Sequence, residues 1–490
     1  MNQRVSTGIH GLDHVLYGGL LRSRLYLLEG DPGVGKTTLA LQFLLAGVAA
    51  GERALYITLS ETEDEIRAIA ESHGWSLAGL AMFELSALEQ QIRIDAENTI
   101  FRPSDVELTE TTRALLRRVD EVTPDRVVFD SLSELRLLAQ NPLRYRREVL
   151  NLKTYFSTRQ CTVLLLDDRT SDPGDQQLQS LAHGVISMQQ RAPDYGGDRR
   201  RLRVTKLRGA AFRGGFHDMV IEPGGVRVFP RLIAAEHHAA FERTPVSSGV
   251  AELDNLLGGG IDRGTSTLLI GGAGTGKSSI MAQYATAAAA RGERGAIFGF
   301  DELRDIAILR ADALGLGMSD HIASGRIVLQ QVDPGELTPG ELAHRAIELV
   351  EREHVKFIAL DTLNGYLHAM PAEQHLYIQL HELLSYLGQR GVTTMLVMAQ
   401  AGMVGTMHSP VDVSYIADNV LLLRYFEAEG RIRKAISVVK KRTGRHENSI
   451  RELSLSSSRG IEVGAPLTQF HGILTGVPQF HGNASQLSTK

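Results

Sequence analysis

The sequence predicts an α/β protein of two tandem domains, each a mainly parallel, twisted sheet flanked by helices. Short apolar stretches alternate with longer segments of helical periodicity, a pattern typical of strands that are covered on both faces in a parallel sheet. A pattern of domain length also occurs twice in the chain. Its 490 residues are too many for one ordinary hydrophobic core.

In the first half, the alternation of strands and helices can be followed residue by residue. We expect a strand at 25–29 (LYLLE), a helix at 37–49 and a second strand at 54–59. Two further apolar stretches, 126–130 and 163–167, are expected to be strands of the same sheet. Because these strands are short and apolar throughout, helices must cover both faces of the sheet.

An internal repeat defines the domains. The segment 5–9 (VSTGI) reappears as 246–250 (VSSGV), and Lys277 follows Lys36 by the same 241 residues. This constant spacing indicates two copies of one fold rather than a solenoid of small units. The expected organisation is a first domain at 1–230, a linker at 231–245, a second domain at 246–455 and a C-terminal tail at 456–490.

Composition narrows the functional classes. The hydrophobic share of 43% and the charged share of 22% are ordinary for a globular protein. The single cysteine, Cys161, permits no intramolecular disulfide and fits a reducing compartment. No apolar stretch approaches the roughly 20 residues that span a bilayer, and the net charge of −5 argues against a general nucleic-acid coat. We expect a cytoplasmic protein that uses neither a membrane nor nucleic acid as its partner.

Each half contains a phosphate-binding loop with the pattern G-x-x-x-x-G-K-[ST]. Its glycines let successive backbone N–H groups point at phosphate oxygens, and the following helix adds its dipole. Lys36 and Lys277 are expected to reach the β- and γ-phosphates. The expected nucleotide-binding residues are Gly30, Asp31, Pro32, Gly33, Val34, Gly35, Lys36, Thr37 and Thr38, and then Gly271, Gly272, Ala273, Gly274, Thr275, Gly276, Lys277, Ser278 and Ser279.

An acidic residue ends an apolar strand downstream of each loop. Asp130 follows the strand of the first half, and Asp361 follows the equivalent strand of the second. A carboxylate at this position typically holds the coordination shell of the nucleotide's magnesium, together with the loop hydroxyl. We therefore expect Thr37, Asp130, Ser278 and Asp361 to bind Mg²⁺, with ATP as the nucleotide.

Hydrolysis or phosphoryl transfer also needs a base that orients the attacking oxygen. The candidates Glu61, Asp301 and Glu302 follow the second strand of each half, and each glutamate lies 25 residues after its loop lysine. Parallel α/β sheets place their chemistry at this edge. The alternative is an acidic helix start that the helix dipole favours.

Together these motifs resemble the KaiC branch of the RecA-like ATPases, the family of circadian-clock ATPases and kinases. The resemblance rests on the tandem loops, the Val-Ser-[ST]-Gly segments, the acids after the second strand, and the segments 206–209 (KLRG) and 450–452 (IRE). The tail at 472–478 is similar to that of the broad KaiC-like group outside the oscillator proper. The resemblance implies RecA-like domains in a homo-hexamer of two stacked rings, with ATP bound between neighbouring chains.

The resemblance assigns trans-acting cations in each half. Lys206 and Arg208 of one chain, and likewise Lys440 and Arg442, would face the phosphates bound by its neighbour. Such cations neutralise the charge that spreads over the γ-phosphoryl group. The alternative is that these basic residues lie on a solvated strand edge.

Two departures from the family bear on the chemistry. The family usually has two consecutive glutamates after the second strand, whereas here the first of them is Ser60 or Asp301. The first half is therefore expected to hydrolyse slowly unless Glu61 acts as the base. The family's paired autophosphorylation sites align with Ser414 and Tyr415, and the longer phenol of Tyr415 does not fit the same in-line geometry. We expect Ser/Thr autokinase activity to be confined to Ser414.

Two other functions remain open from the sequence. The basic segment 198–203 (DRRRLR) suits a nucleic-acid motor that shares the same core, or else a solvated hairpin. The repeated Gln-Phe-His-Gly at 469–472 and 479–482 suits either a protein-docking tail of a nucleotide-gated scaffold or two similar turns that pack on the ring.

Overall fold

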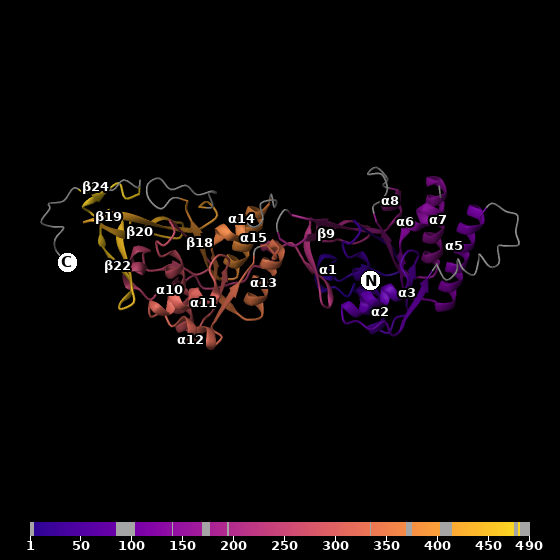
Figure 1. Cartoon of the computed structure of the whole chain (residues 1–490), viewed down its shortest axis with the longest axis horizontal. Helices are drawn as coiled ribbons and strands as arrows, with labels where there is room; N and C mark the ends of the chain where they lie inside the picture. The colour runs from indigo at the N-terminus through magenta and orange to yellow at the C-terminus, as the bar shows by residue number, and fades with distance from the viewer. Residues whose placement is uncertain are drawn as a thin grey trace. The chain divides into compact units, whose positions relative to one another are not determined.

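The computed structural model describes residues 4–84, 103–139, 141–168, 177–193, 196–333, 335–368, 375–401, 414–474 and 479–480. The chain divides into two compact units, Met1–Arg231 and Leu232–Lys490. Each unit contains one nine-stranded, mostly parallel sheet that is flanked by helices, which confirms the predicted fold class (Figure 1).

The first sheet is built from nine strands. These are β3 (Leu25–Glu29), β4 (Ala54–Thr58), β5 (Leu80–Glu84), β6 (Arg126–Asp130), β7 (Thr162–Asp167), β8 (Gly184–Arg191), β9 (Arg199–Leu207), β10 (His217–Glu222) and β11 (Gly225–Phe229). Their order in the sheet is β11-β10-β9-β8-β3-β7-β6-β4-β5. The strands from β8 to β5 run parallel, and the hairpin strands β9, β10 and β11 complete the sheet in antiparallel fashion.

The second sheet repeats this topology. Its strands are β14 (Ser266–Gly271), β15 (Arg294–Gly299), β16 (Ile327–Gln331), β17 (Val355–Asp361), β18 (Thr393–Ala399), β19 (Asn419–Ala428), β20 (Arg431–Lys441), β21 (Arg451–Ser456) and β22 (Gly460–Pro466). Their order, β16-β15-β17-β18-β14-β19-β20-β21-β22, is that of the first sheet when it is followed from the opposite edge. Residues of the two units can therefore be matched strand by strand.

The helices follow the same duplication. The first unit has α1 (His10–Val15), α2 (Lys36–Ala49), α3 (Glu63–Ser72), α5 (Pro103–Val122), α6 (Leu132–Ala139), α7 (Pro142–Thr158) and α8 (Gln177–Leu181). The second has η1 (Ala234–Glu236), α9 (Ala251–Leu256), α10 (Lys277–Ala290), α11 (Arg304–Ala313), α12 (Met318–Ala323), α13 (Pro339–Glu351), α14 (Leu363–His368) and α15 (Leu376–Gln389). None of the helices in the described ranges combines the length and hydropathy that crossing a bilayer requires.

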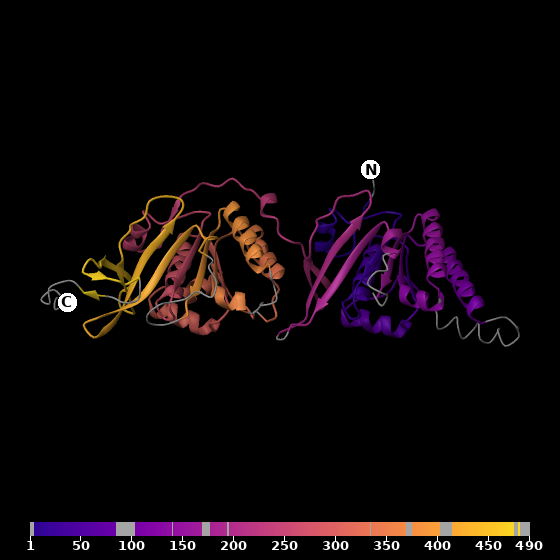
Figure 2. The ribbon, with the colours of Figure 1, turned by 90° about the horizontal axis from the view of Figure 1, so that it is seen from above.

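Each sheet is buried on both faces, as the apolar strands predict. In β3, Tyr26 and Leu28 pack in the core beneath α2, whereas Leu25 and Leu27 pack in the core beneath α6 and α7. The views in Figures 1 and 2 show α2 on one side of the sheet and α6 and α7 on the other. Consecutive side chains of a strand point to opposite faces, so a wholly apolar strand supplies both cores.

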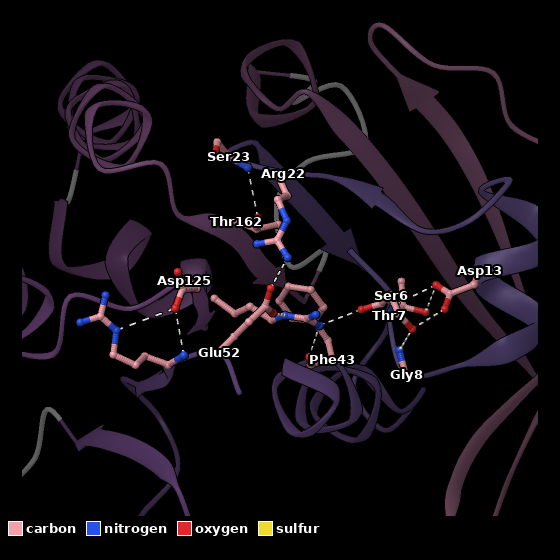
Figure 3. Close-up of polar contacts among 12 residues, drawn as sticks. Ser6, Thr7, Gly8, Asp13, Arg22, Ser23, Phe43, Glu52, Asp125 and Thr162 are labelled. Atoms are coloured by element: carbon pink, nitrogen blue, oxygen red, sulfur yellow. Dashed lines mark hydrogen bonds and ion pairs between the residues drawn. The ribbon is translucent and has the colours of Figure 1, made fainter. Parts of the chain in front are cut away.

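The repeated Val-Ser-[ST]-Gly segment has a structural role in both units. It begins at the last residue of a short strand, β1 (Arg4–Val5) or β12 (Pro245–Val246), which pairs with β2 (Leu20–Leu21) or β13 (Ile261–Asp262). Figure 3 shows Ser6, Thr7 and Gly8 beside Asp13, whose Oδ1 accepts the Thr7 backbone N–H at 2.8 Å. The equivalent N–H of Ser248 bonds Asp254 at 2.8 Å. The repeat therefore preserves an aspartate that orders the turn in front of the sheet.

A buried cation distinguishes the first unit. The Arg126 side chain is 3% exposed, forms an ion pair with Glu52 through Nε, and donates through Nη1 to the carbonyls of Ser6 and Phe43, both at 2.7 Å. Glu52 also pairs with Arg22, a contact visible in Figure 3. In the second unit the register of β17 places Phe357 at the equivalent position. In the first unit, Arg126 therefore links β6 by hydrogen bonds to the segment before α1 and to α2, whereas Phe357 in the second unit has no polar group to do so.

The C-terminal boundary of the second unit lies beyond the position expected from the sequence. The predicted tail starts at residue 456, yet β22 (Gly460–Pro466) pairs with β21 and completes the sheet. Downstream, β23 (Phe470–His471) and β24 (Gln479–Phe480) pair with each other, and Phe470 contacts the Phe426 ring at a centroid distance of 5.3 Å. In the described residues, the aromatic rings of the Gln-Phe-His-Gly repeat thus pack on the unit. His481 and Gly482 lie outside the described residues.

We predict that Arg126→Ala lowers the free energy of unfolding by about 3 kcal/mol, because a buried ion pair is broken and two carbonyls lose their donor. Denaturant-induced unfolding followed by circular dichroism measures the effect. Arg53→Ala is the matched control: its guanidinium is 62% exposed and lies 3.8 Å from Asp125. That change should cost less than about 1 kcal/mol. Equal losses in the two variants would contradict the role given to Arg126.

Candidate functional site

Both phosphate loops connect the central strand of a sheet to the helix that follows it. Gly35 has a φ of 103° and Gly276 a φ of 106°, and each precedes the first residue of its helix. A Cβ atom on Gly35 would lie 2.5 Å from Ile221 Cδ1, and one on Gly276 would lie 2.7 Å from Leu455 Cδ1. The positive φ favours glycine at both positions, and a side chain there would also displace these terminal methyl groups. The helix starts therefore meet the loops as an anion-binding nest requires.

The residues predicted to bind magnesium lie together in each unit. Thr37 Oγ1 donates to Asp130 Oδ2 at 3.2 Å, and Ser278 Oγ donates to Asp361 Oδ1 at 3.1 Å. Each pair offers a hydroxyl and a carboxylate oxygen beside the loop. Mg²⁺ is usually bound by one or two protein oxygens together with water and substrate phosphates, so the donor set fits this ion.

The charged groups of the sites are buried. Burial raises the pKa of Asp361 to about 6 and lowers the pKa of Lys277 to about 8. Burial also raises the pKa of Asp130, although hydrogen bonds oppose the shift, including one of 2.6 Å that the Tyr56 hydroxyl donates. A bound cation would stabilise the carboxylates and a bound phosphate would stabilise the ammonium group. The pocket is thus electrostatically suited to a magnesium nucleotide.

Glu61 has the environment of a general base. Burial, followed by the charge of Asp130, raises the pKa of Glu61 to about 7. Thr58 Oγ1 donates a hydrogen bond to the Glu61 carbonyl oxygen at 2.7 Å and accepts one from the Glu61 backbone N–H at 3.0 Å. Within the described part of the chain, Glu61 Oε2 is buried and has no hydrogen-bond partner. A carboxylate oxygen with a spare lone pair and a pKa near neutrality is suited to accept a proton.

The second unit arranges its acids differently. Arg310 binds Glu302 through two contacts, Nε–Oε1 at 3.1 Å and Nη2–Oε2 at 2.7 Å. Asp301 accepts a hydrogen bond from Thr362. Both acids line a cavity of about 710 Å³ that also contains Lys277 and Ser278. Because Arg310 occupies both oxygens of Glu302, Asp301 is the less encumbered carboxylate of the pair.

The basic residues assigned by family resemblance lie away from their own phosphate loops. Lys206 is opposite Val185 in the β8–β9 ladder, and Val185 packs in the core on the face opposite α2. Side chains directly opposite in a ladder share a face of the sheet. There Lys206 Nζ bonds the carbonyl of Gln179 at 2.5 Å, and Arg208 Nη2 bonds that of Ser180 at 3.3 Å.

The second unit repeats this arrangement around the candidate phosphosite. Lys440 Nζ bonds the carbonyls of Ser414 and Ala417 at 2.8 and 2.7 Å. Arg442 Nη2 bonds the carbonyl of Tyr415 at 2.7 Å. The structure therefore brings Lys440, Arg442 and Ser414 together. Lys440 is opposite Val420 in the β19–β20 ladder, and Val420 packs in the core on the sheet face opposite α10.

Three site residues were not predicted from the sequence: Tyr56, Asp168 and Arg310. Asp168 Oδ1 lies 2.8 Å from Lys36 Nζ. Its signal was present, because it extends the predicted strand 163–167 by a second acid at the functional edge of the sheet. Tyr56 and Arg310 gave no comparable signal, since an aromatic residue in a strand and an arginine in a helix are common.

The basic segment 198–203 forms part of the predicted hairpin. Arg199, Arg200, Arg201 and Arg203 lie within β9, which pairs with β8. Arg201 bonds Gln189 through Nε and Nη2 at 3.1 and 3.0 Å and stacks over the Phe216 ring. These contacts within the protein explain the position of Arg201, and no nucleic-acid partner is needed for it.

Comparison with known proteins identifies the family. The model of the KaiC ATPase family matches residues 5–233 and 246–468. The circadian clock protein KaiC3 of Synechocystis sp. is 24% identical over 491 residues, which cover 98% of this chain and 95% of the relative. The circadian clock oscillator protein KaiC of Synechococcus elongatus is 26% identical over 487 residues, with coverages of 97% and 92%. Circadian clock protein KaiC2 of Synechocystis sp. is 27% identical over 471 residues, with coverages of 93% and 80%. The chain therefore belongs to the KaiC family of ATPases.

Proposed function

We propose that this chain is a magnesium-dependent ATP hydrolase that works as a ring of six copies, with serine autokinase activity in its second unit. One observation carries the proposal. In both units a loop lysine, a loop hydroxyl and a strand-ending carboxylate meet at one edge of the sheet, while a lysine–arginine pair lies on the sheet face opposite the loop helix.

The nucleotide site follows from the loop geometry. Backbone N–H groups of each loop and the ammonium group of Lys36 or Lys277 would bind the phosphates. Thr37 and Asp130, and likewise Ser278 and Asp361, would hold Mg²⁺. When bound, the ion supplies charge neutralisation at the β- and γ-phosphates.

The two units use different acids in this proposal. Glu61 accepts the proton of the attacking water in the first unit, because its Oε2 is uncommitted and its pKa lies near 7. Asp301 has this role in the second unit, where Arg310 holds Glu302. The second site therefore resembles the first in nucleotide binding and differs from it in base chemistry.

We predict a pH dependence for the first site, measured as steady-state ATP turnover of a Lys277→Ala chain. The base acts as a carboxylate, so turnover should rise with pH and level off above a midpoint at or below the metal-free Glu61 pKa of about 7, because a bound cation favours the carboxylate. Below that midpoint the rate should fall about tenfold per pH unit. Glu61→Gln in the same chain should lower turnover about 10²-fold or more and remove this profile. Turnover that is flat or falls as the pH rises through the midpoint would contradict the assignment.

The position of the cations supports assembly into a ring. Lys206 and Lys440 lie on the sheet face opposite their own loop helix, and we assign them to the phosphates that a neighbouring copy binds. Residues supplied in this way stabilise charge on the γ-phosphoryl group, and related arginines contribute roughly 10³–10⁵ in rate. Contacts between unlike faces close into rings, which fits a cyclic hexamer.

We predict that two defective chains complement each other. Both carry Lys36→Ala, which silences the first site; one also carries Lys277→Ala and the other Lys440→Ala with Arg442→Ala. Each is expected to be nearly inactive alone. After mixing under conditions that allow subunit exchange, about a quarter of the second-site turnover should return, because that share of random contacts joins an intact loop to intact cations.

A control separates complementation from a simple sum of residual activities. A mixture of the Lys36→Ala/Lys277→Ala chain with itself at the same total concentration should show no gain in turnover. If the two different chains exchange subunits and the mixture still shows none, the cations do not act between copies.

Autokinase activity is supported by the surroundings of Ser414. Its carbonyl oxygen lies 2.8 Å from Lys440 Nζ, so the hydroxyl-bearing residue and the trans-acting cation share one surface. A neighbouring copy that presents its γ-phosphate to Lys440 thereby presents it near Ser414. In the first unit Gln179 stands at the position that corresponds to Ser414, and the hydroxyl residue Ser180 stands at the position that corresponds to Tyr415.

We predict that incubation with Mg-ATP adds a single phosphate to the chain, detected by intact-mass analysis and phosphopeptide mapping. Ser414→Ala and Lys277→Ala should each abolish the phosphorylated species, since one removes the acceptor and the other the donor site. Tyr415→Phe is the matched control and should retain the modification. Phosphorylation that persists in Ser414→Ala would refute this serine as the acceptor.

A further inference from the structure

The loop lysine of the first unit already has a full set of hydrogen-bond partners. An ammonium group has three N–H donors. Lys36 Nζ contacts the carbonyls of Gly30 at 2.9 Å and Asp31 at 3.0 Å and the carboxylate of Asp168 at 2.8 Å. A phosphate oxygen that binds this lysine must therefore displace one of the three. Asp168 is the only anion among these partners, so it competes for the same electrostatic role as the phosphate.

Among the described residues of the second unit, no carboxylate contacts Lys277. Lys277 Nζ donates to the Gly272 carbonyl at 2.7 Å, and no other hydrogen bond or ion pair of this group occurs in the described residues. The register of the sheets explains the difference. Val163 pairs with Leu25 in the first sheet, and Thr394 pairs with Ser266, the equivalent of Leu25, in the second. Val163 and Thr394 are therefore equivalent, and so are Asp168 and Ala399, which lie five residues further along the chain. An alanine cannot approach the lysine with a charge.

The carboxylate of Asp168 is also held in place from its other side. Ser133 Oγ donates to Asp168 Oδ2 at 2.9 Å. Asn364 occupies the position equivalent to Ser133. Its Oδ1 accepts the Ala399 backbone N–H at 2.7 Å, and its Nδ2 donates to the Ala399 carbonyl oxygen at 2.9 Å. In each unit a side chain thus forms hydrogen bonds with the residue after this strand. In the first unit that residue is Asp168, whose carboxylate contacts the loop lysine, and in the second it is the uncharged Ala399.

We propose that Asp168 is a specificity-determining residue that occupies the lysine contact of the γ-phosphate, so that the first site binds ATP more weakly than the second. The inference rests on the proposed nucleotide sites and adds that their affinities for ATP differ. ADP brings only a β-phosphate oxygen to Lys36, which can replace one of the two carbonyls while Asp168 remains, whereas ATP brings a γ-phosphate oxygen as well. Asp168 therefore shifts the first site toward ADP, and the second site loads with ATP at lower concentration.

The test uses full-length chains that each retain one site. Lys277→Ala reports the first site and Lys36→Ala reports the second, with affinities for Mg-ADP and a slowly hydrolysed Mg-ATP analogue measured by isothermal titration calorimetry. In the Lys277→Ala chain, Asp168→Ala copies the residue of the second unit. It should tighten binding of the ATP analogue by about tenfold and that of ADP by less than about threefold. Asp168→Asn, which keeps the shape and removes the charge, should do the same.

Two further variants make the test reciprocal. Ala399→Asp in the Lys36→Ala chain places the competing carboxylate in the second unit and should weaken the ATP analogue there by about tenfold. Asp167→Asn in the Lys277→Ala chain is the matched control. Its carboxylate lies beside Asp168 but pairs with Arg136 at 3.1 Å. It should change the affinity for either nucleotide by less than about twofold.

The outcomes distinguish this inference from the proposed function. If the Lys36→Ala and Lys277→Ala chains each still bind two nucleotides, the proposed sites are wrong. If each binds one nucleotide, but Asp168→Ala and Asp168→Asn weaken the ATP analogue or leave its affinity unchanged, only the competitor role fails. Misfolding of the Asp168 variants is checked in chains with both loop lysines intact, where the affinity of the second site must stay that of the unmodified chain.

Discussion

Both candidate sites depend on a buried ammonium group at the start of the loop helix. Lys36 and Lys277 are 7% and 6% exposed, and a buried cation is costly unless an anion or a set of oxygens compensates it. The glycines, the helix dipole and the sheet edge all bring negative groups to this point rather than apolar ones. In the proposed sites, the phosphates of a nucleotide would supply anionic oxygens at this point.

Duplication repeated this constraint, and the two units meet it in different ways. In the first, Asp168 neutralises the lysine internally, and Glu61 is left as a carboxyl group with a raised pKa. In the second, the lysine has no carboxylate partner among the described residues, and Arg310 neutralises the acid instead. In the first site the ion pair thus involves the loop lysine, whereas in the second it involves the glutamate after the second strand. Two loops that share the pattern G-x-x-x-x-G-K-[ST] thus lie in different charge environments.

Local patterns made the fold and the nucleotide residues predictable. A phosphate loop, an apolar strand and a strand-ending acid are each contained in a few consecutive residues, and the constant spacing between Lys36 and Lys277 revealed the duplication. The extent of the second sheet was not predicted, because Gly460–Pro466 is rich in small residues and forms a strand only by pairing with β21. The contacts of Asp168 and Arg310 join separate elements, so no local pattern announces them.

The central claim is that both loops bind nucleotide and that each lysine belongs to one site. Native mass spectrometry of the full chain at saturating Mg-nucleotide tests it most directly, because it counts bound nucleotides for each copy of the chain. The account predicts two nucleotides per chain and one in either Lys36→Ala or Lys277→Ala. Two nucleotides retained in either variant, or none bound by the unmodified chain, would contradict it.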